Sequence, residues 1–162
     1  MYVSIQELPT DARLWIYQAD RKLSASEEEK INALTSKFLE TWTAHEKNLK
    51  ASFEIRYHLF LFILIDEKAA MASGCSIDKS MHFILQLERE LGLSFTNRNL
   101  FAYRKGQEVE LISRKEFEEA IAAGTIDDTT IVFNNLIQNK KELDSEWEIP
   151  FAKSWHKTLM LA

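Results

Sequence analysis

LKASFEIRYHLFLFILID, residues 49–66, contains two β-strand patterns in direct succession. Apolar and polar residues alternate over the first half, as in a strand with one buried and one solvated face. Residues 58–66 are apolar on both faces, which is typical of a central strand. The two runs predict a tight hairpin around residues 56–58, although no Asn-Gly or Asp-Gly marks the turn. One continuous extended segment is the alternative.

Towards the N-terminus, the sequence predicts a strand followed by a helix. Residues 13–19 (RLWIYQA) follow a Pro-Thr-Asp turn signal and are rich in aromatic and β-branched side chains, which favours a strand. A capping box, with Ser26 as the N-cap and Glu29 three residues later, opens a helix that reaches residue 42. Residues 43–48 then predict a loop.

Towards the C-terminus, glycines separate the expected elements. Residues 78–91 have a helical pattern and end at a glycine suited to a left-handed C-cap. Residues 100–112 predict a hairpin around Lys-Gly-Gln, and a capping box opens a helix over residues 113–123 that another glycine ends. Residues 130–133 predict a short strand. The polar remainder carries two tryptophans, which we expect to pack back on the body of the protein.

The order of these elements through residue 104 is strand, helix, strand, strand, helix, strand. This is the βαββαβ order of the ferredoxin-like, split βαβ fold. We therefore predict an α+β fold with an antiparallel ferredoxin-like core over about residues 11–105 and a C-terminal hairpin and helix extension over about residues 106–162. No repeat, low-complexity tract or flexible linker interrupts the chain, which predicts a single domain over residues 1–162.

The composition predicts a globular protein without disulfides. Of the 162 residues, 46% are apolar and 28% are charged, which is ordinary for a folded chain. The single cysteine cannot form an internal disulfide, and no signal-peptide pattern opens the sequence. The apolar run at residues 59–65 is much shorter than the ~20 residues that span a bilayer as a helix. We therefore expect a cytoplasmic protein that does not span or bind a membrane.

The charge argues against nucleic acid as a partner. The net charge is −5 and the lysines and arginines are scattered along the chain. A nucleic-acid-binding protein usually presents a basic face, because neutralisation of phosphates supplies most of the non-specific affinity.

The segment ASGCSID, residues 72–78, is the best candidate for a site, because it holds the only cysteine next to a predicted helix start. Unpaired backbone N–H groups at a helix N-terminus favour a thiolate at Cys75, although Asp78 at the N-cap would compete for the same groups. His82 follows Asp78 at the i, i+4 spacing, so His82 or His45 could serve as a base. The alternative, which we favour, is that Cys75 is a small buried hydrophobe.

The same segment resembles an anion-binding turn. Ser73, Gly74 and Ser76 are small residues that feed a helix N-terminus, where backbone N–H groups bind phosphate or carboxylate. Trp42 and Asn134 could add an aromatic wall and a donor to this pocket. The alternative is a plain connection capped by Ser76 or Asp78. No GxxxxGK[ST] sequence occurs, which excludes a P-loop ATPase.

Metal binding is a weaker alternative. Asp66 and Glu67 end the apolar strand and could bind a divalent cation together with Asp78. The four histidines have none of the spacings of zinc sites, so we predict no metal and no cofactor. The Trp155-His156 pair either lines an aromatic pocket or, as we favour, fills the edge of the core while the histidine is hydrogen-bonded locally.

Five segments carry a resemblance to a known family: WIYQADR (residues 15–21), WTAH (42–45), LKASFEI (49–55), ASGCSID (72–78) and IVFNN (131–135). With these, nearly the whole chain resembles a small uncharacterised family of Bacteroidetes-type bacteria that is often labelled "ABC transporter ATPase". The label is a misnomer, since the chain has neither a Walker A loop nor an LSGGQ-like signature. The resemblance implies a bacterial cytoplasmic protein, and it implies no activity, cofactor or catalytic residue.

Together, these patterns predict a non-catalytic module that binds a small anion or a protein through residues 72–78. The alternative is a small thiol-dependent enzyme that uses Cys75 with His82 or His45. Ferredoxin-like sheets also pair through an exposed face or edge, so a homo-oligomer is a further alternative.

Overall fold

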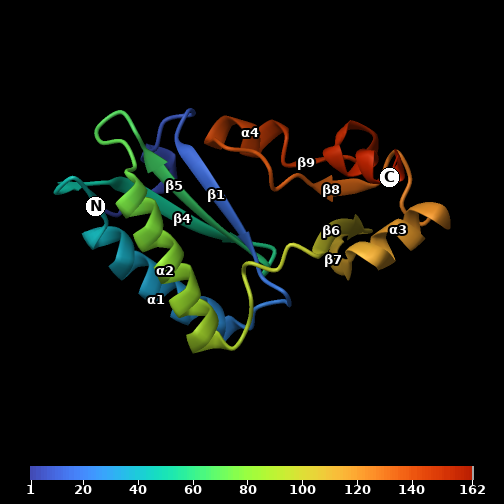
Figure 1. Ribbon diagram of the computed structural model, residues 1–162, viewed down its shortest axis with the longest axis horizontal. Helices are drawn as coiled ribbons and strands as arrows, with labels where there is room; N and C mark the ends of the chain where they lie inside the picture. Colours follow the sequence, from blue (N-terminus) through green and yellow to red (C-terminus); the bar gives the residue numbers. More distant parts are fainter. Residues whose placement is uncertain (162) are drawn as a thin grey trace. The chain divides into compact units, whose positions relative to one another are not determined.

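The computed structural model describes residues 1–161 and has the predicted α+β class (Figure 1). Within these residues it contains four α-helices and three antiparallel sheets. The chain forms two compact units. The first comprises Met1–Thr96 with Gln138–Lys141, and the second comprises Asn97–Ile137 with the residues from Glu142 onward. No helix in the described part of the chain has the length and apolar character needed to cross a membrane.

The first unit is built on a three-stranded sheet with the strand order β1-β5-β4. Its strands are β1 (Arg13–Gln18), β4 (Lys50–Arg56) and β5 (Phe60–Asp66). From Phe60 to Ile65, every residue of β5 is at most 1% exposed, as expected for a central strand that is apolar on both faces. The predicted strand pair at residues 49–66 is therefore confirmed.

The hairpin between β4 and β5 is also confirmed, and its turn uses two residues that rarely adopt the required backbone. Tyr57 and His58 have φ angles of 56° and 53°, in the left-handed region. The Leu59 N–H donates to the Arg56 carbonyl at 3.1 Å and closes the turn. Positive φ at both central positions is the geometry of a type I′ turn, which glycine and asparagine usually supply.

Two helices, α1 (Ala25–Thr41) and α2 (Gly74–Leu91), lie together on one face of this sheet (Figure 1). The rings of Phe38 from α1 and Phe83 from α2 stack at a centroid distance of 4.4 Å. Gly92 ends α2 with a φ of 64°, so the predicted left-handed C-cap is confirmed.

The N-terminus of α1 differs from the prediction by two residues. The N-cap is Ser24, with Glu27 completing the capping box, and not Ser26 with Glu29. Arg21 explains the choice, because its guanidinium forms two hydrogen bonds with the Glu27 carboxylate, at 2.7 and 3.0 Å. This pairing holds the pKa of Glu27 at about 2, with a smaller contribution from the Ser24 N–H.

Residues 43–48 form a two-stranded hairpin and not the predicted loop. Its strands are β2 (Thr43–Ala44) and β3 (Lys47–Asn48). The turn residues His45 and Glu46 have φ angles of 49° and 66°, so this hairpin also has a type I′ geometry without glycine.

The predicted fourth strand of the ferredoxin-like core lies in the other unit. This strand, β6 (Leu100–Lys105), pairs with β7 (Glu108–Ser113) and β8 (Ile131–Phe133), so the complete βαββαβ arrangement is not clearly shown. The free edge of β1 is instead occupied by Gln138–Lys141. The Leu14 N–H donates to the Gln138 carbonyl and the Lys140 N–H to the Ala12 carbonyl, each at 2.9 Å. The boundary between the units consequently falls at Thr96 and not near residue 105.

The second unit contains a four-stranded sheet with the order β7-β6-β8-β9, where β9 is Glu148–Pro150. The predicted hairpin turns at Gly106, and the predicted Ser113–Glu116 capping box opens α3 (Arg114–Ala122). A fourth helix, α4, comprises Lys140–Ser145. The core of this unit is a cluster of buried apolar side chains from β6, α3, β8, the segment between α3 and β8, and the segment after β9: Tyr103, Phe117, Ile126, Val132 and Phe151.

Candidate functional site

The start of α2, where the sequence predicts a site, is organised by a serine capping box. Ser73 is the N-cap, and its Oγ accepts from the Ser76 N–H at 3.1 Å while the Ser73 N–H donates to the Ser76 Oγ at 2.7 Å. The Trp42 indole Nε1–H donates to the Ser76 carbonyl at 2.9 Å. Ser76 and Trp42 are buried, so these three predicted ligand-binding residues hold the helix start in place.

This cap places Cys75 and Asp78 differently from the prediction. The helix begins at Gly74, four residues earlier than expected, because Ser73 provides the cap. Cys75 therefore lies within the first turn and not before it, and Asp78 lies in the second turn and not at the N-cap. Gly74, Cys75 and Asp78 are exposed, so the expectation that Cys75 is a buried hydrophobe is wrong.

The predicted contact between Asp78 and His82 is present, but the full Cys-His-Asp set is not assembled. The Asp78 Oδ2 lies 3.3 Å from the His82 Nδ1, and both side chains are largely solvent-exposed. Cys75 is seven residues before His82, which separates them by about 10 Å along the helix axis. His45, the other predicted base, lies exposed in the β2–β3 turn.

Asn134, the last predicted ligand-binding residue, belongs to the second unit. Its side-chain Oδ1 accepts from the Leu136 N–H at 3.2 Å, and its backbone N–H donates to the Trp147 carbonyl at 2.7 Å. This is a local Asx-type turn after β8, so the Asn134 side chain is used within the turn.

The three carboxylates considered for a metal have other roles in the structure. Glu67 Oε1 accepts from the Arg13 Nη1 at 3.3 Å and from the Ala72 N–H at 3.2 Å, and so it ties down the segment before α2. Asp66 Oδ1 accepts from the Lys68 N–H at 3.0 Å. Among residues 1–161, no group of three or more His, Cys, Asp or Glu side chains is placed to hold a metal ion.

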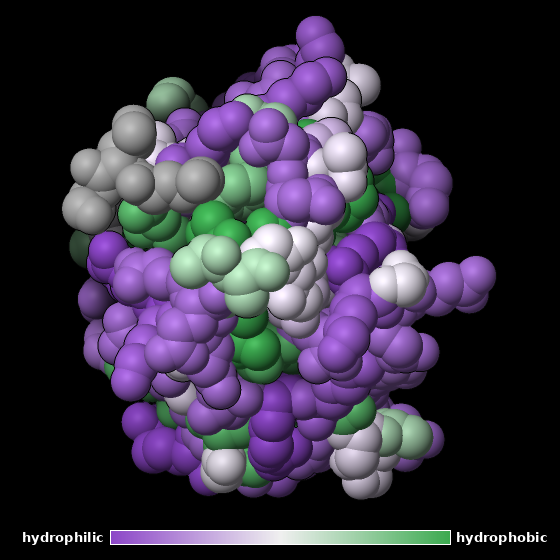
Figure 2. Space-filling view, turned by 90° about the vertical axis from the view of Figure 1, so that its right-hand side faces the viewer, coloured by the Kyte–Doolittle hydropathy of each residue, from purple (hydrophilic) through white to green (hydrophobic). Residues whose placement is uncertain are grey.

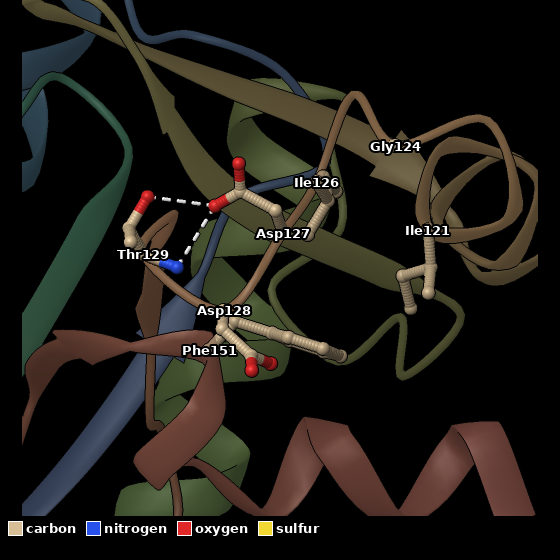
Figure 3. A pocket seen from close by; sticks show the side chains of 7 residues that line it. All are labelled: Ile121, Gly124, Ile126, Asp127, Asp128, Thr129 and Phe151. Carbon is tan, nitrogen blue, oxygen red and sulfur yellow. Dashed lines mark hydrogen bonds between the residues drawn. The ribbon is translucent and has the colours of Figure 1, made fainter.

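A hollow that the sequence analysis missed lies in the second unit. Ile121, Ile126 and Phe151 provide its apolar lining, and Asp127, Asp128, Thr129 and Gly124 complete it (Figure 3). Its volume is about 370 Å³. Figure 2 shows the side of the molecule on which α3 lies. Hydrophobic residues are visible near the middle of this face, surrounded by hydrophilic ones.

Both carboxylates of the hollow are hydrogen-bonded or paired. Thr129 donates to the Asp127 Oδ1 from its hydroxyl at 2.7 Å and from its N–H at 2.8 Å, as the dashed lines in Figure 3 show. These bonds, chiefly the one from the hydroxyl, hold the pKa of Asp127 below its usual value. The Asp128 Oδ1 lies 3.1 Å from the Lys157 Nζ. No prediction was made for this segment, in which the available signal was an isoleucine between a glycine and two aspartates.

A buried histidine lies in the aromatic core of the same unit. His156 is 2% exposed, stacks on Trp155 at 4.0 Å, and its Nδ1 lies 2.5 Å from the Ser154 Oγ. Phe101 and Phe117 approach the imidazole at 5.5 Å. Burial lowers the pKa of His156 to about 4, so the ring is neutral at physiological pH. The favoured interpretation, a core histidine with a local hydrogen bond, is therefore confirmed for this residue.

Comparison with known proteins adds no family or fold assignment. The chain matches no protein-family model, no curated protein and no solved structure.

Proposed function

We propose that the chain is a non-catalytic binding module whose ligand is another protein. Its binding face consists of the exposed side of α2 together with the segment before the helix. A protein ligand is favoured over a small anion, because the side chains of Ser73 and Ser76 are engaged in the capping box and the Asp78 carboxylate is close to the helix N-terminus.

One observation carries this proposal: large apolar side chains are exposed on α2 and in the segment just before it. Among the residues whose exposure the structure describes, seven large hydrophobic side chains are exposed, and three of them lie here. Met71 is 70% exposed, Met81 40% and Leu85 37%. Met81 and Leu85 are four residues apart and therefore share one side of the helix. Methionine side chains are flexible and polarizable, which suits a binding surface.

The opposite side of α2 is buried and holds the helix in place, which supports the same proposal. Ser76, Ser80, Phe83, Ile84 and Leu87 are buried, so the exposed side chains project from a rigid scaffold. The polar residues beside them carry both signs of charge, with Asp78 next to Lys79 and Arg89 at the far end. We infer that the partner presents an apolar surface of low net charge, such as the apolar face of an amphipathic helix.

A photo-crosslinking amino acid at position 81, introduced in cells, tests the proposal against a control at position 136. Leu136 is also apolar and 64% exposed, but it lies in the second unit. We expect position 81, and not position 136, to capture one protein, which then binds the purified chain. Met81→Glu with Leu85→Glu should weaken that binding about tenfold or more, the effect of losing an interface hot spot. Equal capture at both positions would contradict the proposal, and capture of a second copy would identify a homo-oligomer instead.

The second candidate is a small thiol-dependent enzyme, and two separate observations favour it: Cys75 is exposed, and Asp78 contacts His82 further along the same helix. An activated thiolate would react with iodoacetamide near neutral pH with an apparent pKa below the usual ~8.5. His82→Gln would then raise that apparent pKa. If the folded chain and a free cysteine peptide give the same pH profile, the enzyme hypothesis is excluded.

For the fold, we propose that the first unit is a ferredoxin-like arrangement with a substituted fourth strand. The order β1-β5-β4 supports this, because it has the first strand beside the third and the third beside the second. The fourth strand of such a sheet lies beside the first, and Gln138–Lys141 runs antiparallel to β1 at that edge. A solved structure in which this segment is not paired with β1 would contradict the proposal.

From the resemblance, we propose that the chain belongs to the Bacteroidetes family described above and acts in the cytoplasm as a single domain. Support comes from the five sequence segments and from the single cysteine. Fractionation of the native bacterium, followed by detection of the chain in the periplasmic or membrane fraction, would contradict the location.

A further inference from the structure

The outer edge of β4, at one side of the first sheet, is only partly paired (Figure 1). The Ala51 N–H donates to the Met1 carbonyl at 3.0 Å and the Ala51 carbonyl accepts from the Val3 N–H at 2.9 Å, so the N-terminal segment pairs with β4 at this residue. Alternate residues of a strand direct their backbone groups to the same side, so those of Phe53 and Ile55 also face away from β5. In the described part of the chain, these two N–H and two C=O groups have no partner. An open strand edge is a template for a further strand.

A hollow lies where the N-terminal segment turns away from this edge. Residues 1–7 form one wall of the hollow, and Ser52 and Phe53 form the other. Its volume is about 620 Å³, which is within the range of ligand pockets. Tyr2 and Phe53, whose rings lie 5.3 Å apart, give it an aromatic lining. Ser52 is 1% exposed and its hydroxyl has no hydrogen-bond partner among the described residues, so a bound group can provide one.

Two lysines hold the N-terminal wall of the hollow in place. This wall contains a short 3₁₀-helix, η1 (Ile5–Glu7). The Lys50 Nζ donates to the Glu7 carbonyl at 3.1 Å, and the Lys140 Nζ donates to the Ile5 carbonyl at 2.8 Å. These contacts tie the wall to the body of the first unit, so that little of it has to be ordered when a ligand binds.

The charge of β4 argues against a second copy of the chain as the added strand. When two β4 edges pair about a two-fold axis through all of these open groups, Phe53 lies opposite Ile55 of the second copy. Glu54 then lies directly opposite Glu54 of the second copy, at a non-hydrogen-bonded position where side chains are closest. Like charges directly opposite each other destabilise a sheet. Glu54 pairs with Arg56 of its own strand at 2.6 Å, and a basic residue on the added strand would give it a second contact.

We propose that the β4 edge and its hollow bind an extended segment of a partner protein by strand addition. The segment pairs antiparallel with residues 53–55, and its backbone bonds with the four open groups. It places a basic residue opposite Glu54 and a tyrosine in the hollow, where the ring packs on Tyr2 and Phe53 and the hydroxyl reaches Ser52. Tyrosine suits this hollow, because it joins an aromatic body to a polar end. The site shares no residue with the α2 face and is independent of the function proposed above.

Nuclear magnetic resonance titration of the full chain with acetyl-Thr-Val-Lys-Val-Tyr-amide tests the pairing. The backbone amide signals of residues 53–55 and 2–7 should shift. In the antiparallel arrangement, the N–H groups of both valines face β4 and that of the lysine faces away. N-methylation of the second valine should therefore weaken binding about tenfold or more, whereas N-methylation of the lysine, the matched control, should leave the affinity nearly unchanged.

A double-mutant cycle tests the contact in the hollow. Replacing the tyrosine of the peptide with phenylalanine should weaken binding to the wild-type chain about fivefold, the effect of one hydrogen bond. The Ser52→Ala variant should bind the tyrosine and phenylalanine peptides equally, because the partner of the tyrosine hydroxyl is then absent.

Any of four results would overturn the proposal. The first is that the signals of residues 53–55 do not move at millimolar peptide. The second is equal weakening by the two N-methyl groups, which would mean that strand pairing does not hold the peptide. The third is the same ratio of affinities for the two peptides in the wild type and in Ser52→Ala, which would place the tyrosine outside the hollow. The fourth is a dimer in analytical ultracentrifugation, with concentration-dependent signals of residues 53–55 in the peptide-free chain, which would identify a second copy as the occupant.

Discussion

The two units use different physical means to keep their cores together. In the first unit, a strand buried on both faces lies under two long helices (Figure 1). In the second unit, short strands enclose aromatic side chains together with a titratable histidine. The comparison indicates that the two cores should respond differently to mild acid, because only the second contains a histidine whose pKa is lowered by burial.

The largest expected effect comes from removing an aromatic ring from the second core. Phe117 is fully buried and contacts the rings of Phe101, Phe151 and His156. Phe117→Ala should lower the free energy of unfolding by about 3–5 kcal/mol. In hydrogen exchange, the amides of β6 and β8 should lose protection while those of β5 keep it. Equal loss of protection in both sheets would contradict the comparison, because the two cores would then open as one cooperative unit.

Mild acid should destabilise the second unit next most strongly. The pKa of His156 is lowered by burial from 6.5 to about 4, so the unfolded chain binds a proton at a pH where the folded chain does not. Stability is therefore full above pH 6.5 and falls by roughly 3 kcal/mol as the pH is lowered to 4. Urea unfolding at a series of pH values measures this loss.

A variant of the histidine provides the control for the acid effect. His156→Asn keeps a polar side chain beside Ser154 and removes the titration, so its stability should change little between pH 6.5 and 4. A pH dependence as steep as that of the wild type would show that another group is responsible.

Loss of a helix cap should lower the free energy of unfolding less than these changes do, and by similar amounts in the two units. Ser73→Ala removes the acceptor of the Ser76 N–H in α2 and should cost about 1 kcal/mol. Ser113→Ala removes the corresponding acceptor of the Glu116 N–H in α3 and is the matched variant in the second unit. Thermal unfolding of both variants checks the values. A cost well above 2 kcal/mol at Ser73 alone would mean that the site predicted at this helix start has a structural role beyond capping.

The smallest effect should be an acid response of the first unit at much lower pH. The pKa of Glu27 lies near 2, chiefly because of its hydrogen bonds with Arg21, so the contribution of this pair is present above pH 4.5 and lost as the pH falls to 2. The pair lies at the surface, where ion pairs contribute little. Glu27→Gln should flatten the acid unfolding curve of the first unit, followed by circular dichroism, only below pH 4.5. A change near pH 6 would contradict this assignment.

The sequence predicts those elements whose signals are local. The strand pair at residues 49–66 follows from its hydrophobic pattern, and α3 from the capping box at Ser113, because neighbouring residues provide all the information. The choice between Ser24 and Ser26 could not be made locally, since each has a glutamate three residues later. The contact with Arg21 decides it.

Pairing between distant segments could not be predicted. The edge of β1 is occupied by residues more than 120 positions away, and β6 lies in a different sheet. In the candidate sites, too, only contacts between neighbouring residues could be predicted. The i, i+4 contact of Asp78 and His82 follows from helix geometry, whereas the hollow at Ile121 and Phe151 requires the fold.

The edge of β1 has a consequence for synthesis on the ribosome. Its partner, Gln138–Lys141, emerges only after the 41 residues of Asn97–Ile137 have been translated. At roughly 5–20 residues per second, the nascent first unit waits about 2 to 8 s with a bare strand edge. An unpaired edge is a template for pairing with another chain. Translation speed through the second unit thus sets how long each nascent chain is open to its neighbours on the same polysome.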